Sequence, residues 1–280
     1  MKRVYMRYPG FRSKALTLSY DDGVEQDAPF IDILNKAGIK CTFNLNSNKF
    51  LKEHKEFPAG RVHRLLTQEA AVALYKNSGH EVAVHTLDHP FPDSISPVIA
   101  TAQIYEDRKN LEKMFETEVR GMAYPYGLYT DEMIEIAKNC GIAYSRTTVS
   151  THSFALPNDW MRLPATCHHK DPKLMELCDK FLNQQVKERA LLFYLWGHTF
   201  EFESADNWNV IEEFCEKMGG HDDIWYATNI QIHDYIEAYR ALRFSADGEY
   251  VFNPSYMPVY LYVYSENMQY IIQPGERIKL

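Results

Sequence analysis

Two short motifs combine residue types that bind metal ions and move protons. Asp21 and Asp22 stand together before a glycine, at the end of the apolar run 15–20. His85 and His89 follow a second apolar run, and a separation of four places both imidazoles on one face of a helical turn. Two imidazoles and one carboxylate form a ligand set that leaves a coordination position for water. The pattern predicts metal-assisted hydrolysis.

Each motif taken alone has a structural interpretation. An Asp-Asp-Gly turn also caps a following helix, and histidines four apart also occur on surfaces without any ligand role. Because both motifs follow neighbouring predicted strands, their joint placement favours a metal site. Adjacent residues of an extended chain point in opposite directions, so Asp21 and Asp22 are not equivalent ligands. One of them is free to act as general base, and their spacing does not say which.

Two further motifs lie at predicted strand ends. Tyr126 is in the turn Tyr-Pro-Tyr-Gly, which also has a purely structural interpretation. His198 ends a very apolar run, and an imidazole with a pKa near 6.5 suits proton donation near neutral pH. We expect a neighbouring carboxylate to support His198 and Trp196 to line an acyl or sugar pocket. The candidate carboxylates are Asp159, Glu201 and Glu203.

Together the motifs resemble the polysaccharide deacetylase (NodB-homology) family, of the carbohydrate esterase type, over roughly residues 13–243. The family pairs an Asp-Asp-Gly turn with His-Ser/Thr-x-x-His on a distorted (β/α) barrel. The resemblance implies that the first aspartate is the general base and that the second aspartate is a metal ligand. It also implies that the backbone N–H of the turn tyrosine donates to the oxyanion and that the late histidine is the general acid. The implied catalytic residues are Asp21, Tyr126 and His198, the implied metal ligands are Asp22, His85 and His89, and Thr86 would brace the ligand loop.

One position departs from the family pattern. Where many members have an arginine that orients the catalytic aspartate, this chain has Ala123. We expect Arg162, on the predicted strand MRLPA, to replace it, with Arg146 and Arg120 as further candidates. A surface ion pair is the other interpretation of Arg162.

Apolar runs alternate with helical patterns from Ala15 to about Leu242, which is typical of βα units around a parallel sheet. We predict an α/β fold: a distorted (β/α) barrel of about seven parallel strands over residues 1–243. Residues 244–280 alternate in the manner of antiparallel strands and are predicted to form a small C-terminal β appendix. A row of tyrosines there packs against the main domain or, less favoured, stacks on sugars: Tyr260, Tyr262 and Tyr264.

The predicted function is that of a metal-dependent hydrolase that removes an N-acetyl or other acyl group from an amino-sugar-containing saccharide. Zinc is the expected ion for a His, His and Asp set, although cobalt, nickel and manganese also suit it. Two alternatives stay open. One is an amidohydrolase acting on a non-carbohydrate amide or ureide, such as a small acylated amine, and the other is a catalytically silent carbohydrate-binding barrel.

Composition narrows the classes of partner. The formal net charge is -8 and no Lys/Arg cluster occurs, which argues against nucleic acid. No apolar run is long enough to span a membrane, and the basic N-terminus lacks the apolar core of a signal peptide. We therefore expect a cytoplasmic protein without a membrane partner. The five cysteines form no C-x-x-C pair and are expected to be reduced. Nothing in the sequence indicates the oligomeric state.

Two other histidine groups have structural interpretations. Cys167, His168 and His169 are zinc-ligand types, but no partners lie at suitable spacing, so a second zinc site is not favoured. His221 is expected in the polar turn before the strand DIWYAT.

Overall fold

The central sheet is a parallel barrel. The computed structural model describes residues 2–280, and within them nine strands form one sheet whose pairs are all parallel. The order along the sheet is β7-β6-β5-β4-β3-β2-β9-β8, with β10 paired to β2. The strands are β2 (Lys14–Asp21), β3 (Cys41–Leu45), β4 (Glu81–Val84), β5 (Gly121–Ala123), β6 (Tyr144–Ser150), β7 (Leu163–Ala165), β8 (Cys167–His168), β9 (Leu191–Gly197) and β10 (Ile224–Tyr226).

The segment 163–168 closes the sheet. Its first half, β7, pairs with β6, and its second half, β8, pairs with β9 at the other end of the strand order. A single extended segment therefore joins both edges, and this confirms the predicted distorted barrel. The strand number exceeds the predicted seven in part because β8 follows the predicted strand MRLPA as an additional short strand.

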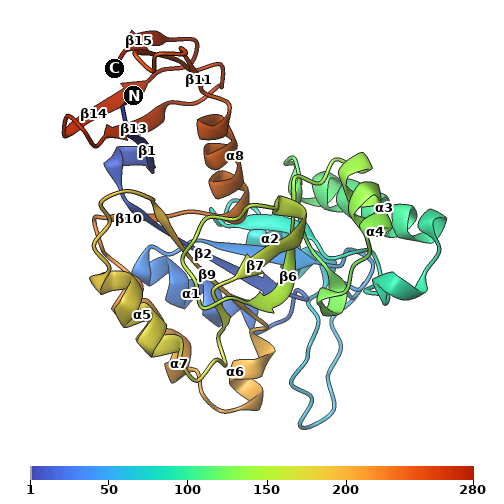
Figure 1. Ribbon diagram of the computed structural model, residues 1–280. Coiled ribbons are helices and arrows are strands. Elements are labelled where there is room, and N and C mark those ends of the chain that lie inside the picture. Colours follow the sequence, from blue (N-terminus) through green and yellow to red (C-terminus); the bar gives the residue numbers. More distant parts are fainter. Residues whose placement is uncertain (1) are drawn as a thin grey trace.

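Helices cover the outside of the barrel (Figure 1). Helix α1 shows how the sequence sets their limits: Phe30, Ile31 and Leu34 are buried, and Gly38 ends the helix in a left-handed conformation (φ 68°). Thr67 caps α2 by accepting a hydrogen bond from the N–H of Ala70. The helices are α1 (Asp27–Ala37), α2 (Gln68–Tyr75), α3 (Pro97–Phe115), α4 (Asp131–Asn139), α5 (Leu174–Asn183), α6 (Phe200–Ser204), α7 (Asn209–Met218) and α8 (Asn229–Arg240), with 3-10 turns at Pro9–Phe11, Pro92–Ser94, Pro125–Gly127 and Trp160–Arg162.

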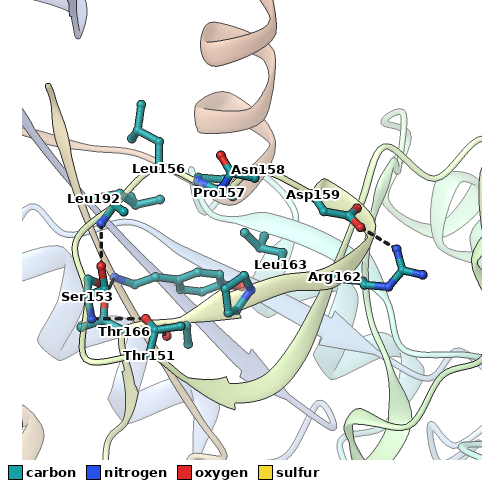
Figure 2. Close-up of a pocket in the computed structure, with 14 residues that line it drawn as sticks. Thr151, Ser153, Leu156, Pro157, Asn158, Asp159, Arg162, Leu163, Thr166 and Leu192 are labelled. Carbon is teal, nitrogen blue, oxygen red and sulfur yellow. Dashed lines mark hydrogen bonds and ion pairs between the residues drawn. The ribbon is translucent and has the colours of Figure 1, made fainter.

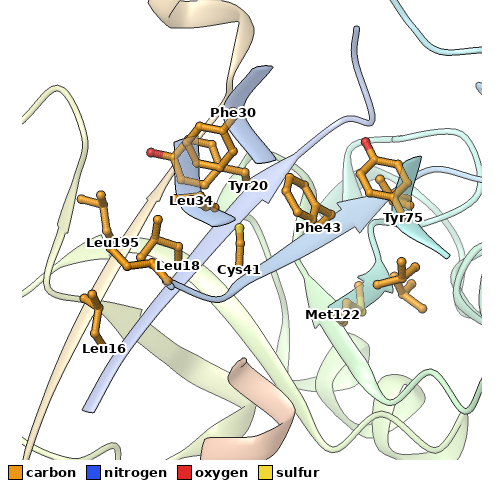
Figure 3. Close-up of a cluster of buried hydrophobic side chains, with 14 of the residues drawn as sticks. Leu16, Leu18, Tyr20, Phe30, Leu34, Cys41, Phe43, Tyr75, Met122 and Leu195 are labelled. Atoms are coloured by element: carbon orange, nitrogen blue, oxygen red, sulfur yellow. The ribbon is translucent and has the colours of Figure 1, made fainter. Parts of the chain in front are cut away.

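Strand β2 separates the main core from the barrel interior. Alternate residues pack into the cluster beneath the helices (Figure 3): Leu16, Leu18 and Tyr20. The residues between them are polar and make contacts inside the barrel: Thr17 to Asn229, Ser19 to Asn44, and Asp21 to both Asn44 and Arg146. The interior is therefore polar along this strand, and the last residue to point inward is Asp21.

Two antiparallel sheets lie beyond the barrel (Figure 1). One has the order β1-β13-β14 and the other β11-β12-β15. Strand β1 leads through residues 8–13 to the start of β2, so the sheet that contains β1 lies at the opposite end of β2 from Asp21, and the second sheet lies beside it (Figure 1). Their strands are β1 (Val4–Arg7), β11 (Arg243–Phe244), β12 (Tyr250–Phe252), β13 (Val259–Val263), β14 (Met268–Ile272) and β15 (Arg277–Lys279).

The extra strands at the C-terminus confirm the predicted antiparallel appendix, although an N-terminal strand, β1, also joins it. The row of tyrosines packs against the N-terminal segment. Tyr260 contacts Phe11, Tyr262 lies under the guanidinium of Arg7, and the Tyr264 ring meets that of Tyr5. These contacts favour the packed interpretation over a sugar-stacking strip.

All five cysteines are free, as predicted, and all are buried. His221 lies in the turn before β10, where its ring contacts the carbonyl of Lys217. No helix among residues 2–280 is both long and apolar enough to cross a membrane.

Candidate metal centre and active site

The predicted site residues converge at the C-terminal ends of the barrel strands. Asp21 is the last residue of β2, His85 directly follows β4, and His198 directly follows β9. Because parallel strands bring their carboxyl ends to one rim, residues far apart in sequence meet there. The predicted ligands Asp22, His85 and His89 each offer one atom, and these atoms lie within 4.8 Å of one another.

A backbone contact fixes the orientation of His85. Its Nδ1 lies 2.8 Å from the carbonyl oxygen of Ala123. A carbonyl only accepts, so Nδ1 carries the proton and Nε2 keeps its lone pair. That Nε2 lies 4.0 Å from a carboxylate oxygen of Asp21 and 4.0 Å from one of Asp22. His85 therefore presents an unprotonated nitrogen to the centre of the site.

The protonation states suit metal binding. Burial lowers the pKa of His85, and burial together with the neighbouring His85 lowers the pKa of His89 to about 4. Burial raises the pKa of Asp22, but a hydrogen bond from His63 and the nearby imidazoles outweigh it and hold the pKa well below its usual range. At neutral pH the site therefore holds neutral imidazoles and an ionised carboxylate, the forms that ligate metals.

The three residues fit a zinc-like ion. Zn–N and Zn–O distances of about 2.0–2.2 Å place two ligands of one ion at most about 4.4 Å apart. Ligand atoms within 4.8 Å of one another reach that separation with small side-chain rotations. Asp22, His85 and His89 would hold the ion and leave a position for water.

Sequence reasoning missed His63. Its Nε2 lies 3.0 Å from Oδ2 of Asp22, while Oδ1 of Asp22 faces His85. His63 comes from the long segment between β3 and α2, and its ring packs edge-to-face against Phe200 at 4.9 Å. No sequence spacing indicated it, because the contact depends on how this segment folds back over the barrel rim.

Arg146 holds Asp21. Its Nη2 donates a 2.5 Å hydrogen bond to Oδ2 of Asp21, and both side chains are almost fully buried. Asn44 donates to Oδ1 at 2.8 Å. Burial raises the pKa of Asp21, but the charges of Arg146 and of the nearby histidines outweigh it and leave the pKa below its usual value. Asp21 is therefore ionised, with both oxygens fixed.

The prediction that Arg162 replaces the arginine missing at position 123 is wrong. Arg162 pairs with Asp159 and Asp131 at the surface, and Figure 2 shows the Asp159 pair. This pair borders a cavity of about 310 Å³ that contains none of the predicted catalytic residues. Arg146 takes the role instead because it is the β6 partner of Ala123 across the strand pair. Arg120 pairs with Asp234, away from Asp21.

The ligand loop is braced by residues other than the predicted one. The Thr86 hydroxyl is buried and has no hydrogen-bond partner among residues 2–280, so the bracing role predicted for it is wrong. Asn46 donates to the carbonyls of His85 and Thr86, at 2.5 and 2.8 Å. Asp107, buried on α3, accepts from the N–H of His85 at 3.2 Å.

Several site residues have left-handed backbones. The φ angles are 84° at Asp22, 65° at Thr86, 59° at His89 and 58° at Tyr126. Such conformations cost about 1–3 kcal/mol for non-glycine residues and cluster at functional sites. The ring of Tyr126 lies 4.5 Å from that of His89 and stacks on Phe91 at 4.2 Å. Tyr126 and Phe91 are each about half exposed. An exposed aromatic pair therefore borders the ligand His89.

His198 lies between two carboxylates. Its Nε2 is 3.7 Å from Oδ2 of Asp21, and its Nδ1 is 3.5 Å from Oε2 of Glu201. Burial lowers the pKa of His198, but Glu201, Asp21 and Asp22 outweigh it and raise the pKa above the ordinary value. Of the three predicted supporting carboxylates, Glu201 contacts His198, whereas Glu203 pairs with Arg64 and Asp159 with Arg162.

Trp196 packs inside the barrel. Its ring lies 4.4 Å from the guanidinium carbon of Arg146, and only 8% of the residue is exposed. It therefore helps to position the guanidinium that holds Asp21.

Comparison with known proteins finds a matching family model and several relatives. The model of the family described as Polysaccharide deacetylase matches residues 9–145. A chitooligosaccharide deacetylase of Sinorhizobium fredii is 24% identical over 156 residues, which cover 55% of this chain and 63% of the relative. YxkH of Bacillus subtilis, assigned to the polysaccharide deacetylases, is 25% identical over 138 residues, covering 48% of this chain and 45% of the relative. The chain thus spans less than two thirds of the length of these curated relatives.

Solved structures agree on the fold. A Mycobacterium smegmatis protein assigned to the polysaccharide deacetylases superposes with a TM-score of 0.59 at 16% identity, over 86% of this chain and 96% of that one. The family 4 carbohydrate esterase from Streptomyces lividans, in complex with acetate, gives a TM-score of 0.51 at 11% identity, over 76% and 91%. At these identities the likeness concerns the barrel alone.

Proposed function

We propose that this chain, whose residues 9–145 belong to the polysaccharide deacetylase family, is a metal-dependent deacetylase that removes an N-acetyl group from an amino-sugar-containing saccharide. The observation that carries the proposal is the convergence of three elements at one rim. These are a ligand set, a buried carboxylate held by a guanidinium, and a histidine 3.7 Å from that carboxylate.

Asp22, His85 and His89 would hold the ion. A bound divalent ion, with zinc preferred for this donor set, would polarise the acyl carbonyl and acidify water. Asp21 takes the proton from the attacking water. The low pKa of Asp21 keeps the carboxylate ionised, and the hydrogen bonds from Arg146 and Asn44 fix its orientation. The remaining lone pairs of its oxygens are available to accept the proton of the water.

His198 donates a proton to the departing amine. Its raised pKa favours the protonated form, which a general acid requires. Glu201 holds the imidazole from the Nδ1 side, so that Nε2 faces the site. Asp21 and His198 thus divide the work of base and acid.

Tyr126 supplies an oxyanion donor through its backbone N–H. The left-handed conformation of this residue makes a tight turn beside His89. A preorganised N–H that meets developing negative charge typically contributes about 2.7–4 kcal/mol to catalysis.

A saccharide substrate fits the surroundings of the site. The exposed rings of Phe91 and Tyr126 beside His89 offer flat apolar surface to a sugar ring. The amidohydrolase alternative drew on the missing arginine at position 123, and Arg146 now supplies that guanidinium. The silent-barrel alternative used the tyrosine-rich appendix as its contact surface, and those tyrosines pack against the N-terminal segment.

Acetate release tests the proposal. The zinc-loaded protein should release acetate from chito-oligosaccharides, and the chelator-treated protein should not. Asp21→Asn should lower kcat by about 10²–10⁴-fold with metal content unchanged. Asp131→Asn, at an exposed carboxylate, serves as the matched control. A zinc-loaded wild type that releases no acetate from any N- or O-acetylated saccharide would overturn the proposal.

A further inference from the structure

A second group of ligand-type side chains lies beside the first. His168 ends β8, His198 follows β9, and Glu201 is on α6. One nitrogen of each histidine and one oxygen of Glu201 lie within 4.8 Å of one another. The sequence contains no partners at suitable spacing for His168. The pairing of β8 with β9 supplies them, because it aligns His168 with Trp196, two residues before His198.

Nitrogen atoms crowd around a single carboxylate oxygen. Oε2 of Glu201 lies 3.2 Å from Nε2 of His168, 3.2 Å from Nε2 of His169 and 3.5 Å from Nδ1 of His198. It also accepts a long hydrogen bond, 3.4 Å, from the backbone N–H of His198. Lys170 contacts the other oxygen, Oε1, at 2.7 Å. One oxygen therefore faces three imidazoles, while the lysine is on the opposite side of the carboxylate.

Two of these imidazoles are poorly satisfied by hydrogen bonds, whereas Nδ1 of His168 accepts one from the N–H of Lys170 at 3.1 Å. Nδ1 of His198 and both ring nitrogens of His169 are buried and have no aligned hydrogen-bond partner among residues 2–280. Unsatisfied buried polar groups are costly and call for an explanation such as an ion. Burial lowers the pKa of His169 to about 4, so its ring is neutral at neutral pH. Glu201 stays ionised, since burial raises its pKa but its contacts with the histidines and Lys170 outweigh burial.

We propose that His168, His198 and Glu201 form a second divalent-cation site, of the zinc class, next to the site of Asp22, His85 and His89. Two imidazole nitrogens and one carboxylate oxygen are donors that zinc prefers. His168, His198 and Glu201 are each partly exposed as residues. Cys167 takes no part because it is buried in the main core.

This site fills after the first one. The ammonium of Lys170 contacts Glu201 and repels a cation bound there, although half of that side chain is exposed and free to move away. The second ion therefore binds more weakly than the first.

Occupation of the second site has a consequence for catalysis, and this consequence rests on the proposed function. With Nδ1 bound to a cation, the ring of His198 carries one proton on Nε2 and does not act as an imidazolium acid. Excess zinc therefore inhibits acetate release without removing the first ion.

Zinc titration of the purified chain, followed by equilibrium dialysis and elemental analysis, tests the second site. We expect two zinc ions per chain in the wild type and one in His168→Gln. His89→Gln should also bind one, and the double variant none. Lys170→Gln should tighten the weaker site by roughly 5- to 10-fold because a like charge is removed. Circular dichroism identifies a variant that fails to fold, and Lys170→Gln gives an independent test in that case.

Two results would overturn the second site. One is a wild type that binds a single zinc with His168→Gln unchanged. The other is a Lys170→Gln variant whose weaker zinc site has the same affinity as the weaker site of the wild type. Acetate release gives a separate measurement: zinc in excess should inhibit the wild type and spare His168→Gln. A protein without any deacetylase activity would refute the proposed function while the zinc stoichiometry still decided the second site.

Discussion

Arg146 reaches Asp21 from the strand position directly opposite Ala123. The two strands β5 and β6 pair in parallel with Ala123 beside Arg146, and the guanidinium donates to Oδ2 of Asp21 at 2.5 Å. The guanidinium that the resemblance led us to expect at position 123 therefore comes from the neighbouring strand. The ring of Trp196 packs over the guanidinium carbon at 4.4 Å and limits its movement.

Replacing Arg146 should impair both catalysis and folding. Arg146→Met leaves the Asp21 carboxylate buried without its cation, which costs about 3–5 kcal/mol of stability for a broken buried pair. We expect kcat to fall at least about 100-fold because the base loses its orientation. Acetate release and urea unfolding measure the two effects.

The matched control is Arg162→Met, since Arg162 forms only surface ion pairs and should change stability by less than about 1 kcal/mol. In the Arg146→Ala background, Ala123→Arg should restore part of the lost rate by returning the guanidinium to the neighbouring strand. Equal losses from the Arg146 and Arg162 variants would contradict the assignment.

His63 should increase the affinity of the first metal site. Its Nε2 lies 3.0 Å from Oδ2 of Asp22, which it orients while Oδ1 faces His85. Groups that orient a metal ligand are worth about 10–100-fold in affinity, so His63→Ala should weaken zinc binding by that factor. Competition with a chromogenic chelator measures it. His54→Ala, exposed on the same segment, is the control, and unchanged affinity in His63→Ala would exclude the role.

The sequence was most informative where chemistry and strand periodicity coincide. Asp21, Asp22, His85 and His198 were each assigned to a strand end, and parallel pairing places all such ends at one rim. Local capping preferences also explain the start of α2 at Thr67 and the end of α1 at Gly38. These features depend on a few neighbouring residues or on a general property of the fold.

Features that depend on register or on long loops were beyond the sequence. Choosing Arg146 over Arg162 requires the alignment of β5 with β6, which no local pattern specifies. His63 meets Asp22 only because a long segment folds back over the rim. Likewise, His168 gains its partners through the pairing of β8 with β9. The unpaired Thr86 hydroxyl shows that a motif match does not fix a hydrogen bond.

The aromatic pair beside His89 should affect substrate binding more than turnover. Phe91 is 53% exposed and stacks on Tyr126 at 4.2 Å. If a sugar packs on this surface, Phe91→Ala should raise KM about 2- to 10-fold, the equivalent of about 0.5–1.5 kcal/mol for one aromatic contact. Because the ring does not touch the reacting atoms, kcat should change little. Tyr105→Ala, equally exposed on α3, controls for general surface effects. A fall in kcat with unchanged KM would argue against a sugar contact.

Asp27 should make stability fall as the pH rises. This carboxyl begins α1 and accepts hydrogen bonds from the hydroxyls of Tyr75 and Thr199. Burial raises its pKa to about 7, despite these hydrogen bonds, whereas in the unfolded chain it ionises near pH 4. Between about pH 4 and 7 the unfolded chain thus binds fewer protons than the folded one, so the free energy of unfolding decreases with pH in this window.

The Asp27→Asn variant isolates this effect because an amide does not titrate. Relative to the variant, the wild type should lose up to about 4 kcal/mol of stability between pH 4 and 7. This figure follows from the difference between a pKa of about 7 in the folded protein and one near 4 in the unfolded chain. Urea unfolding at several pH values measures the difference between the two proteins. Asp32→Asn, at an exposed position of the same helix, should run parallel to the wild type. A difference between wild type and Asp27→Asn that stays constant with pH would show that Asp27 is ionised in the folded protein.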